Sequence, residues 1–105
     1  MLTSVEAFDK SLTRSNPTSL SVGRMAMAST CVGDFAIFGG GRESYNEASA
    51  VDAYDKSLTR TILTDLSVSR AYLASAKVGD YALFCGGLDN QSDEVFNTVD
   101  VYQVA

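Results

Sequence analysis

Short apolar runs bounded by glycine and aspartate dominate the pattern of hydrophobic and polar positions along the chain. Residues 35–38 (FAIF) and 81–84 (YALF) are such runs, and residues 25–31 and 71–77 ahead of them mix small with apolar side chains. Runs of about four to eight such residues without a helical period are typical of strands buried on both faces. The pattern therefore predicts an all-β chain.

Two further strands are expected beside each of these pairs. Residues 5–8 and 51–54 alternate between apolar and polar positions, which predicts half-buried strands whose acidic side chains face solvent. Residues 12–18 and 58–64 are polar and rich in threonine, which suits an outermost strand that must resist pairing with other chains. Each unit of the chain is thus expected to form four antiparallel strands.

An internal repeat organises these elements. The segment VEAFDKSLTR at residues 5–14 returns 46 positions later as VDAYDKSLTR, and the stub VDVY opens a further copy at Val99. We divide a single domain, residues 1–105, into a repeat at 5–50, a repeat at 51–98 and a partial repeat at 99–105. Self-similarity at this period is typical of arrays and propellers, whose units bury their faces only by stacking on neighbours.

The connections between the predicted strands differ in length. Tight hairpins are expected where glycine supplies a positive φ or aspartate closes an Asx turn, namely at Gly33-Asp34, Gly79-Asp80, residues 9–11 and residues 55–57. Residues 42–47 and 88–94 form longer connections unlike each other, and residues 19–24 and 65–70 form extended ones. Because the long connections share one end of an up-and-down sheet, we expect a rim of variable loops there, which we call the loop rim.

Composition excludes several classes of function. The 105 residues include no histidine and carry a net charge of -5. A chain without histidine cannot build a Ser-His-Asp triad, a Cys-His pair or an imidazole-ligated metal site, so we expect no metal and no cofactor. The acidic balance without clustered Lys or Arg disfavours nucleic acid and membrane surfaces as partners, and no apolar run approaches the length of a bilayer span.

Compartment and cysteine chemistry stay open. Residues 1–6 lack the basic and apolar regions of a secretory signal, which favours the cytoplasm without fixing the location. Cys31 and Cys85 occupy different places in the repeat, and we expect them to be buried, unpaired thiols. The sequon Asn90-Gln91-Ser92 has meaning only in a secreted protein.

Three recurrent features suggest a known family. A double glycine follows the second strand, an aromatic-Asp pair ends the third (Phe8-Asp9, Tyr54-Asp55), and an arginine precedes the first. In order and spacing these features resemble the Kelch repeat, the four-stranded blade of a β-propeller. The resemblance implies about two blades plus a shared or incomplete one. Its structural residues here are Arg24, Gly40, Gly41, Tyr54, Arg70, Gly86, Gly87 and Tyr102.

The chain departs from the family at one position. Kelch repeats usually carry a tryptophan in the fourth strand, where Ser15 and Thr61 stand here. The contact between neighbouring blades is therefore expected to be weaker, or to be supplied by leucines at positions 12, 20, 58 and 66.

Most recurrent residues have a structural interpretation. Arg24 and Arg70 are expected to hydrogen-bond backbone carbonyls rather than an anionic ligand. The glycines at residues 39–41 are not followed by a helix or by Lys-Ser/Thr, so they are expected to let the strand pass a bulky neighbour rather than to cradle phosphate. By the same reasoning Gly86→Val should overpack a tight strand and destabilise the fold by about 1 to 3 kcal/mol.

Two blades alone leave large faces uncovered, and the strand order at the two ends of the chain is complementary with one strand in surplus. Copies could therefore join head to tail, three chains giving a six-bladed ring. The chain could instead be a piece of a longer polypeptide, the alternative we favour slightly, or a monomer that compacts its strands into a sandwich.

The leading functional hypothesis is a non-catalytic scaffold that binds a protein or other ligand at the loop rim, or a homo-oligomer that closes a propeller ring. Its candidate binding residues are Arg42, Tyr45, Asn46, Asp89, Asn90 and Phe96. One alternative is a sugar-acting enzyme of the mutarotase or oxidase kind, with Glu43, Asp89 or Asp93 as acid-base groups. Calcium at residues 89, 93 and 94 is disfavoured because the spacing of a calcium loop is absent. A purely structural blade pair is the third possibility.

Overall fold

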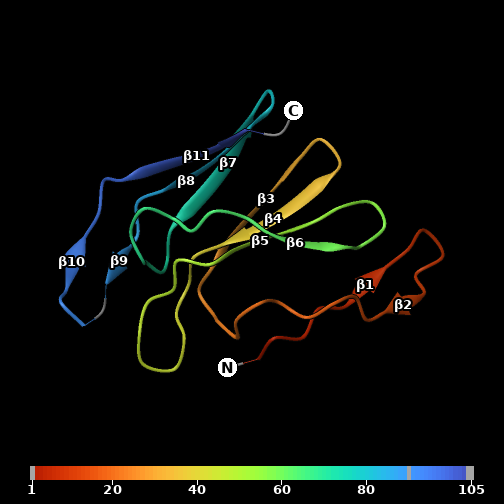
Figure 1. Ribbon diagram of the computed structural model, residues 1–105, viewed down its shortest axis with the longest axis horizontal. Helices are drawn as coiled ribbons and strands as arrows, with labels where there is room; N and C mark the ends of the chain where they lie inside the picture. Colours follow the sequence, from red (N-terminus) through yellow and green to blue (C-terminus); the bar gives the residue numbers. More distant parts are fainter. Residues whose placement is uncertain (1, 90, 104–105) are drawn as a thin grey trace.

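A computed structural model describes residues 2–89 and 91–103, which form a row of antiparallel sheets (Figure 1). Within these residues there are eleven strands and no helix, which confirms the prediction of an all-β chain. The strands are β1 (Ala7–Phe8), β2 (Arg14–Ser15), β3 (Ala28–Val32), β4 (Phe35–Gly39), β5 (Val51–Tyr54), β6 (Arg60–Ile62), β7 (Ala74–Val78), β8 (Tyr81–Cys85), β9 (Leu88–Asp89), β10 (Glu94–Val95) and β11 (Val99–Gln103). Nothing in the described ranges is a helix capable of crossing a membrane.

Two larger sheets and two small hairpins make up the molecule. The first sheet has the order β3-β4-β5-β6, and the second has the order β11-β8-β7. β1 pairs with β2 ahead of the first sheet, and β9 pairs with β10 in the connection between β8 and β11. Neighbouring strands are antiparallel, and no sheet formed by the described residues closes on itself.

The two larger sheets share one register. Val32 pairs with Phe35 in the first sheet as Val78 pairs with Tyr81 in the second. The third strand follows the same rule, because Gly39 pairs with Val51 and Cys85 with Val99. The sheets lie next to each other, with β3 in contact with β7. Positions in the two sheets can therefore be compared one by one.

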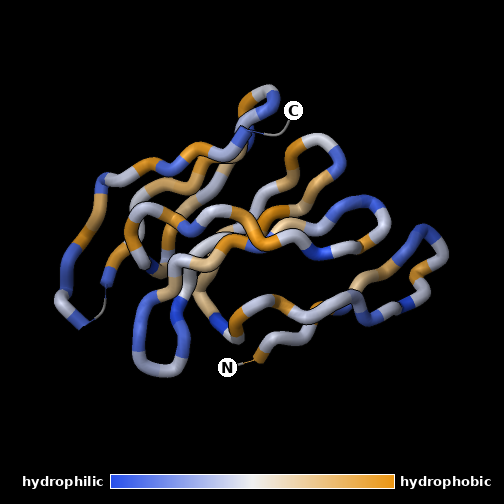
Figure 2. Tube along the Cα trace, in the orientation of Figure 1, coloured by the Kyte–Doolittle hydropathy of each residue, from blue (hydrophilic) through white to orange (hydrophobic). Residues whose placement is uncertain are grey.

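The hydrophobic core lies between these two sheets. Ile37, Val51 and Ala53 of the first sheet pack against Ala82 and Phe84 of the second. Leu66 and Leu73, from the connection between the sheets, complete this core. Figure 2 shows the resulting pattern, with apolar residues along the strands and polar residues in the outer turns.

The predicted Asx turns are confirmed. The Asp9 carboxylate Oδ1 accepts the backbone N–H groups of Ser11 and Thr13 at 2.9 Å each. The Asp55 carboxylate repeats this arrangement with Ser57 at 2.9 Å and Thr59 at 3.0 Å. The aspartate of each aromatic-Asp pair thus serves the turn rather than the strand.

The glycines do not all act as expected. A Cβ on Gly39 would lie 3.0 Å from the ring of Phe84, so this glycine does let the strand pass a bulky neighbour. Gly86 follows β8 rather than lying within it, and the nearest atom to a Cβ there is the Phe96 carbonyl oxygen at 3.7 Å. The expectation of overpacking at Gly86 is therefore wrong. Its φ of +71°, which valine rarely adopts, is the reason for glycine there.

Two further expectations from the sequence are wrong. All four residues of β5 are buried, Asp52 included, so this strand is not half-buried with its acidic side chain in solvent. Both cysteines are unpaired, as expected, but Cys31 is exposed and Cys85 only half-buried. Cys31 lies opposite Ala36 on the face of the first sheet that the second sheet does not cover.

Candidate functional site

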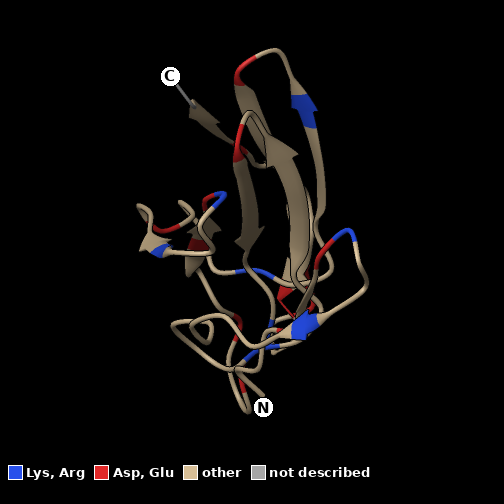
Figure 3. Ribbon diagram, turned by 90° about the vertical axis from the view of Figure 1, so that its right-hand side faces the viewer, with Lys and Arg blue, Asp and Glu red and all other residues tan. Residues whose placement is uncertain are grey.

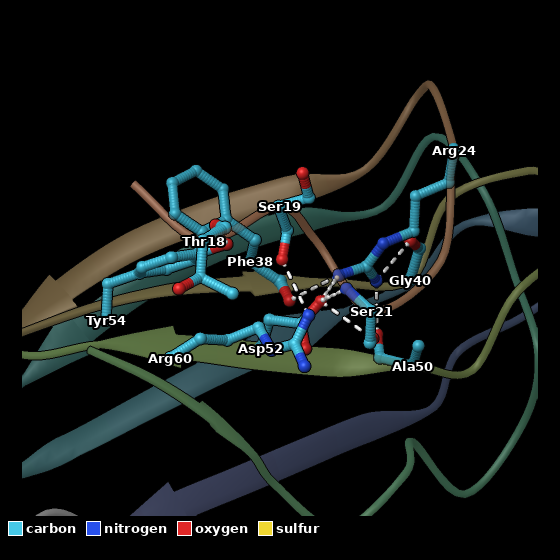
Figure 4. Close-up of polar contacts among 10 residues, drawn as sticks. All are labelled: Thr18, Ser19, Ser21, Arg24, Phe38, Gly40, Ala50, Asp52, Tyr54 and Arg60. Atoms are coloured by element: carbon cyan, nitrogen blue, oxygen red, sulfur yellow. Dashed lines mark hydrogen bonds and ion pairs between the residues drawn. The ribbon is translucent and has the colours of Figure 1, made fainter. Parts of the chain in front are cut away.

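A buried ion pair joins the start of the first sheet to its third strand (Figure 4). Arg24 Nη2 lies 2.9 Å from Asp52 Oδ2, and both side chains are fully buried. The guanidinium also donates to the carbonyls of Phe38 at 3.3 Å and Gly40 at 3.0 Å, and to that of Ala50. Arg24 thereby holds together the end of β4 and the residues just before β5.

The same carboxylate fastens the segment of residues 18–24 onto β5. Asp52 Oδ2 accepts the Ser21 backbone N–H at 3.0 Å and the Ser21 hydroxyl at 2.9 Å. The Tyr54 hydroxyl donates to the Thr18 carbonyl at 2.6 Å, and Arg60 donates to the Ser19 carbonyl at 2.6 Å. Figure 4 shows these side chains pointing toward residues 18–21.

The second sheet carries the same cluster. Arg70 Nη1 lies 2.9 Å from Asp100 Oδ2, which also accepts the N–H and hydroxyl of Ser67 at 3.1 Å each. Arg70 donates to the carbonyls of Gly86 at 2.6 Å and Phe84 at 2.8 Å, and also to that of Val68. We call these two groups, Arg24–Asp52–Ser21 and Arg70–Asp100–Ser67, the arginine clusters.

Burial shapes the electrostatics of the first cluster. It lowers the pKa of the Arg24 guanidinium, although the Asp52 carboxylate opposes this shift. Burial, followed by the charge of Asp52, raises the pKa of the Tyr54 phenol. Arg24 Nε and Asp52 Oδ1 have no hydrogen-bond partner among the described residues, whereas Arg70 Nε donates to a carbonyl. The first cluster is therefore fully buried although two of its polar atoms lack a hydrogen-bond partner.

The second cluster is more open. The Asp100 side chain is 18% exposed. Burial on its own would raise the pKa of Asp100, but the hydrogen bonds from Arg70 and Ser67 outweigh it and hold that pKa below its usual value. Burial, with Asp100 adding to it, raises the pKa of the Tyr102 phenol to about 12. Tyr102 donates to the Thr64 carbonyl at 2.6 Å, as a neutral phenol does.

The loop rim is held together by a residue that the sequence analysis did not select. Gln91 Nε2 donates to the Tyr45 carbonyl, and it lies 3.4 Å from Asn46 Oδ1. The Asp89 carboxylate accepts the Gln91 backbone N–H at 2.9 Å and so fixes the turn that carries the amide. The two loops, 46 residues apart, are therefore in direct contact, and three predicted rim residues come together at Gln91.

The remaining rim candidates lie apart from this contact. Arg42 pairs with Glu47 at 3.1 Å and exchanges backbone hydrogen bonds with Met25, at the base of its loop. Phe96 is half-buried, and its N–H donates to the Gly87 carbonyl at 3.0 Å. Asn90 lies outside the described residues. Figure 3 shows charged residues mainly toward the ends of the strands, where the turns and loops lie.

A cavity of about 400 Å³, open on one side, lies between the two larger sheets. Phe35, Ile37 and Ala53 give it an apolar wall, while Thr61 and Tyr102 contribute polar groups. Glu43, Asp89 and Asp93, the acid-base candidates, do not line it. Within residues 2–89 and 91–103 no group of three His, Cys, Asp or Glu side chains is arranged to hold a metal ion.

The sequence analysis missed four members of the arginine clusters, Ser21, Asp52, Ser67 and Asp100. A signal was present, because Leu-Ser-Val and Val-Asp recur at equivalent positions in the repeat. Alternation along residues 51–54 assigned Asp52 to solvent instead. Comparison with protein-family models gives no match, and comparison with curated proteins gives no significant match.

Proposed function

We propose that the chain is built of Kelch-type propeller blades and acts as a non-catalytic scaffold whose loop rim binds a protein partner. The four-stranded sheet supports the blade interpretation, because its strands pair in sequence order from β3 to β6. The contact between β3 and β7, the first strands of the two sheets, also supports it, since the inner strands of adjacent blades face each other around a propeller axis.

The observation that carries the binding function is the Gln91 contact. It joins residues 42–47 and 88–94 into one surface that spans both sheets. Tyr45 on the first loop and Val95 in β10, at the end of the second, are each 79% exposed and offer large apolar groups within a polar surrounding. Tyrosine is enriched among the residues that contribute most to protein interfaces. The arginine clusters, by contrast, are built against backbone carbonyls and leave Arg24 and Asp52 without solvent access.

The experiment compares two rim variants with a matched control. The wild-type chain is immobilised, and each protein that it retains is purified and titrated against Tyr45→Ala, Phe96→Ala and Leu12→Ala. Leu12 is as exposed as Tyr45, at 79%, but lies in the short hairpin between β1 and β2. We expect Tyr45→Ala to weaken binding at least tenfold, equivalent to about 1.4 kcal/mol, and Leu12→Ala to leave it unchanged.

Two results would contradict the proposal. Partner binding that survives both rim changes would place the interface elsewhere. Saturable turnover in a screen of sugars and sialic acids, lost on Glu43→Gln, Asp89→Asn or Asp93→Asn, would favour the sugar-acting enzyme instead. Equal urea unfolding curves for all variants establish that the comparison concerns binding and not folding.

A further inference from the structure

The same face of the two larger sheets differs sharply in exposure. In the first sheet, three residues of this face are 0–2% exposed: Val32, Val51 and Ala53. Their equivalents in the second sheet, by register, are 52–61% exposed: Val78, Val99 and Val101. The described residues thus include one covered and one bare copy of the same apolar face, and the bare copy is a candidate docking surface.

The covered copy shows which surface fits this face. Ala82 and Phe84 of the second sheet, both fully buried, pack onto it. The contact is close, because a Cβ on Gly39 would lie 3.0 Å from the Phe84 ring. A partner for the bare face should therefore offer an alanine and a phenylalanine at alternate positions of a strand.

The chain carries that surface a second time. Ala36 and Phe38 in β4 are the equivalents of Ala82 and Phe84 in β8, and both are only half-buried. Among the described residues the hairpin of β1 and β2 pairs with no strand of the first sheet. One end of the molecule thus presents the bare face, and the other end presents the surface that covers it.

We propose that the bare face of β7, β8 and β11 binds a second copy of this chain, through the Ala36–Phe38 side of that copy's first sheet. β11 of one copy then takes the place of β1 beside β2 of the other. The described part of the second sheet has β11 at its edge, with no strand on its outer side. In the first sheet, the outer side of the equivalent strand β5 is paired with β6.

The strand that must give way has few pairs with its neighbour, although the segment ahead of it is anchored by the Leu20 N–H, which donates to the Thr3 carbonyl at 2.9 Å. β1 and β2 share only two residue pairs, Ala7 with Ser15 and Phe8 with Arg14. The ion pair between Arg14 and Glu6, at 3.4 Å, is more than half exposed and contributes little. In the new pairing Tyr102 lies opposite Arg14 of the other copy, as Tyr54 lies opposite Arg60 within the chain.

This contact joins two different surfaces, so it repeats from copy to copy until a ring closes. Propellers close with about four to eight blades. On the blade interpretation proposed above, a ring closed by this 105-residue polypeptide alone, with its two repeats, holds about two to four copies. The inference concerns the outer faces of the sheets and does not depend on the loop rim.

Light scattering on a sizing column, over a concentration range of the full chain, tests the proposal. We expect a discrete particle of two to four copies for the wild type and for Val95→Lys, and a folded monomer for Val101→Lys. Val95 is the matched control because it is an exposed valine outside the docking face. A wild type that remains monomeric at every concentration, or a Val101→Lys variant of unchanged mass, would overturn the proposal.

Thiol labelling provides a second readout that does not depend on mass. Cys85 is the equivalent of Gly39, so the Phe38 ring of the second copy should cover it after a shift of a few tenths of an ångström. We expect Cys85 to be protected in the wild type and to react in Val101→Lys. Cys31, the equivalent of the exposed Lys77, should react in both proteins. Equal labelling of Cys85 in both proteins would contradict the docking geometry, whereas Tyr45→Ala should change neither mass nor labelling.

Discussion

At the scale of single residues, each arginine cluster supplies hydrogen bonds that a strand alone cannot. The guanidinium of Arg24 binds carbonyls of residues 38, 40 and 50, where the chain leaves one strand and approaches the next. A buried charge of this kind is tolerated only when it is paired and hydrogen-bonded. Asp52 provides the pairing, and Ser21 uses the same oxygen to hold the incoming segment.

The repeat provides an internal comparison for the strength of this pairing. Asp52→Ala leaves Arg24 buried without its counter-ion, and we expect a loss of about 3 to 5 kcal/mol in the free energy of unfolding. Asp100→Ala should be less harmful, by about 1 to 3 kcal/mol, because the Asp100 side chain is 18% exposed and water can reach Arg70 once the carboxylate is gone. Urea unfolding of both variants measures the difference. A larger loss for Asp100→Ala would contradict this account of burial.

Acid should weaken the second cluster in a defined range. The pKa of Asp100 is lower in the folded chain than in the unfolded chain, where it is about 3.9. Its contribution to stability is therefore present above pH 4 and is lost as the pH falls through the folded value. We expect the stability gap between wild type and Asp100→Asn, measured by urea unfolding, to be widest at neutral pH and to narrow below about pH 4. A gap that stays constant from pH 7 to pH 2 would show that this carboxylate does not contribute through its charge.

What the sequence can show at this scale depends on distance along the chain. The Asx turns at Asp9 and Asp55 were predictable because donor and acceptor lie within four residues. Arg24 and Asp52 are 28 residues apart, so no local pattern links them. Alternation predicted a solvent face for β5, but residues 18–24 cover that face and turn the exposed position into a buried one.

At the scale of elements, strand centres were more predictable than strand ends. Residues 51–54 were predicted with the bounds that β5 has, because the repeat match begins at Val51 and Asp55 opens the turn that follows. The outermost strand, expected at residues 58–64, shrinks to β6 (Arg60–Ile62), since only three of its residues pair with β5. The hairpin of β9 and β10 was missed altogether. It depends on the Asp89 side chain and on a positive φ at Asp93, and neither gives a periodic signal.

At the scale of the whole molecule, the two sheets contact each other unevenly. Near β3 and β7 the packing is close, as the approach of Phe84 to Gly39 shows. Toward the outer strands the sheets leave the cavity of about 400 Å³, where Ala53 and Thr61 form a cross-strand pair of small side chains. Thr61 stands where the resemblance implies a tryptophan, and it lines this cavity. Of the leucines expected to supply the contact instead, Leu66 lies in the core, whereas Leu12 and Leu58 are exposed.

Filling the cavity tests whether sheet packing limits stability. Thr61→Ile keeps a β-branched side chain in the strand and adds apolar volume facing the second sheet, so we expect a gain of about 0.5 to 2 kcal/mol in the free energy of unfolding. Thr59→Ile is the matched control, because Thr59 is exposed like Thr61 but lies outside the cavity. Urea unfolding of both variants separates packing from a general effect of isoleucine. If both substitutions change stability equally, the gap between the two sheets is not what limits the stability of the fold.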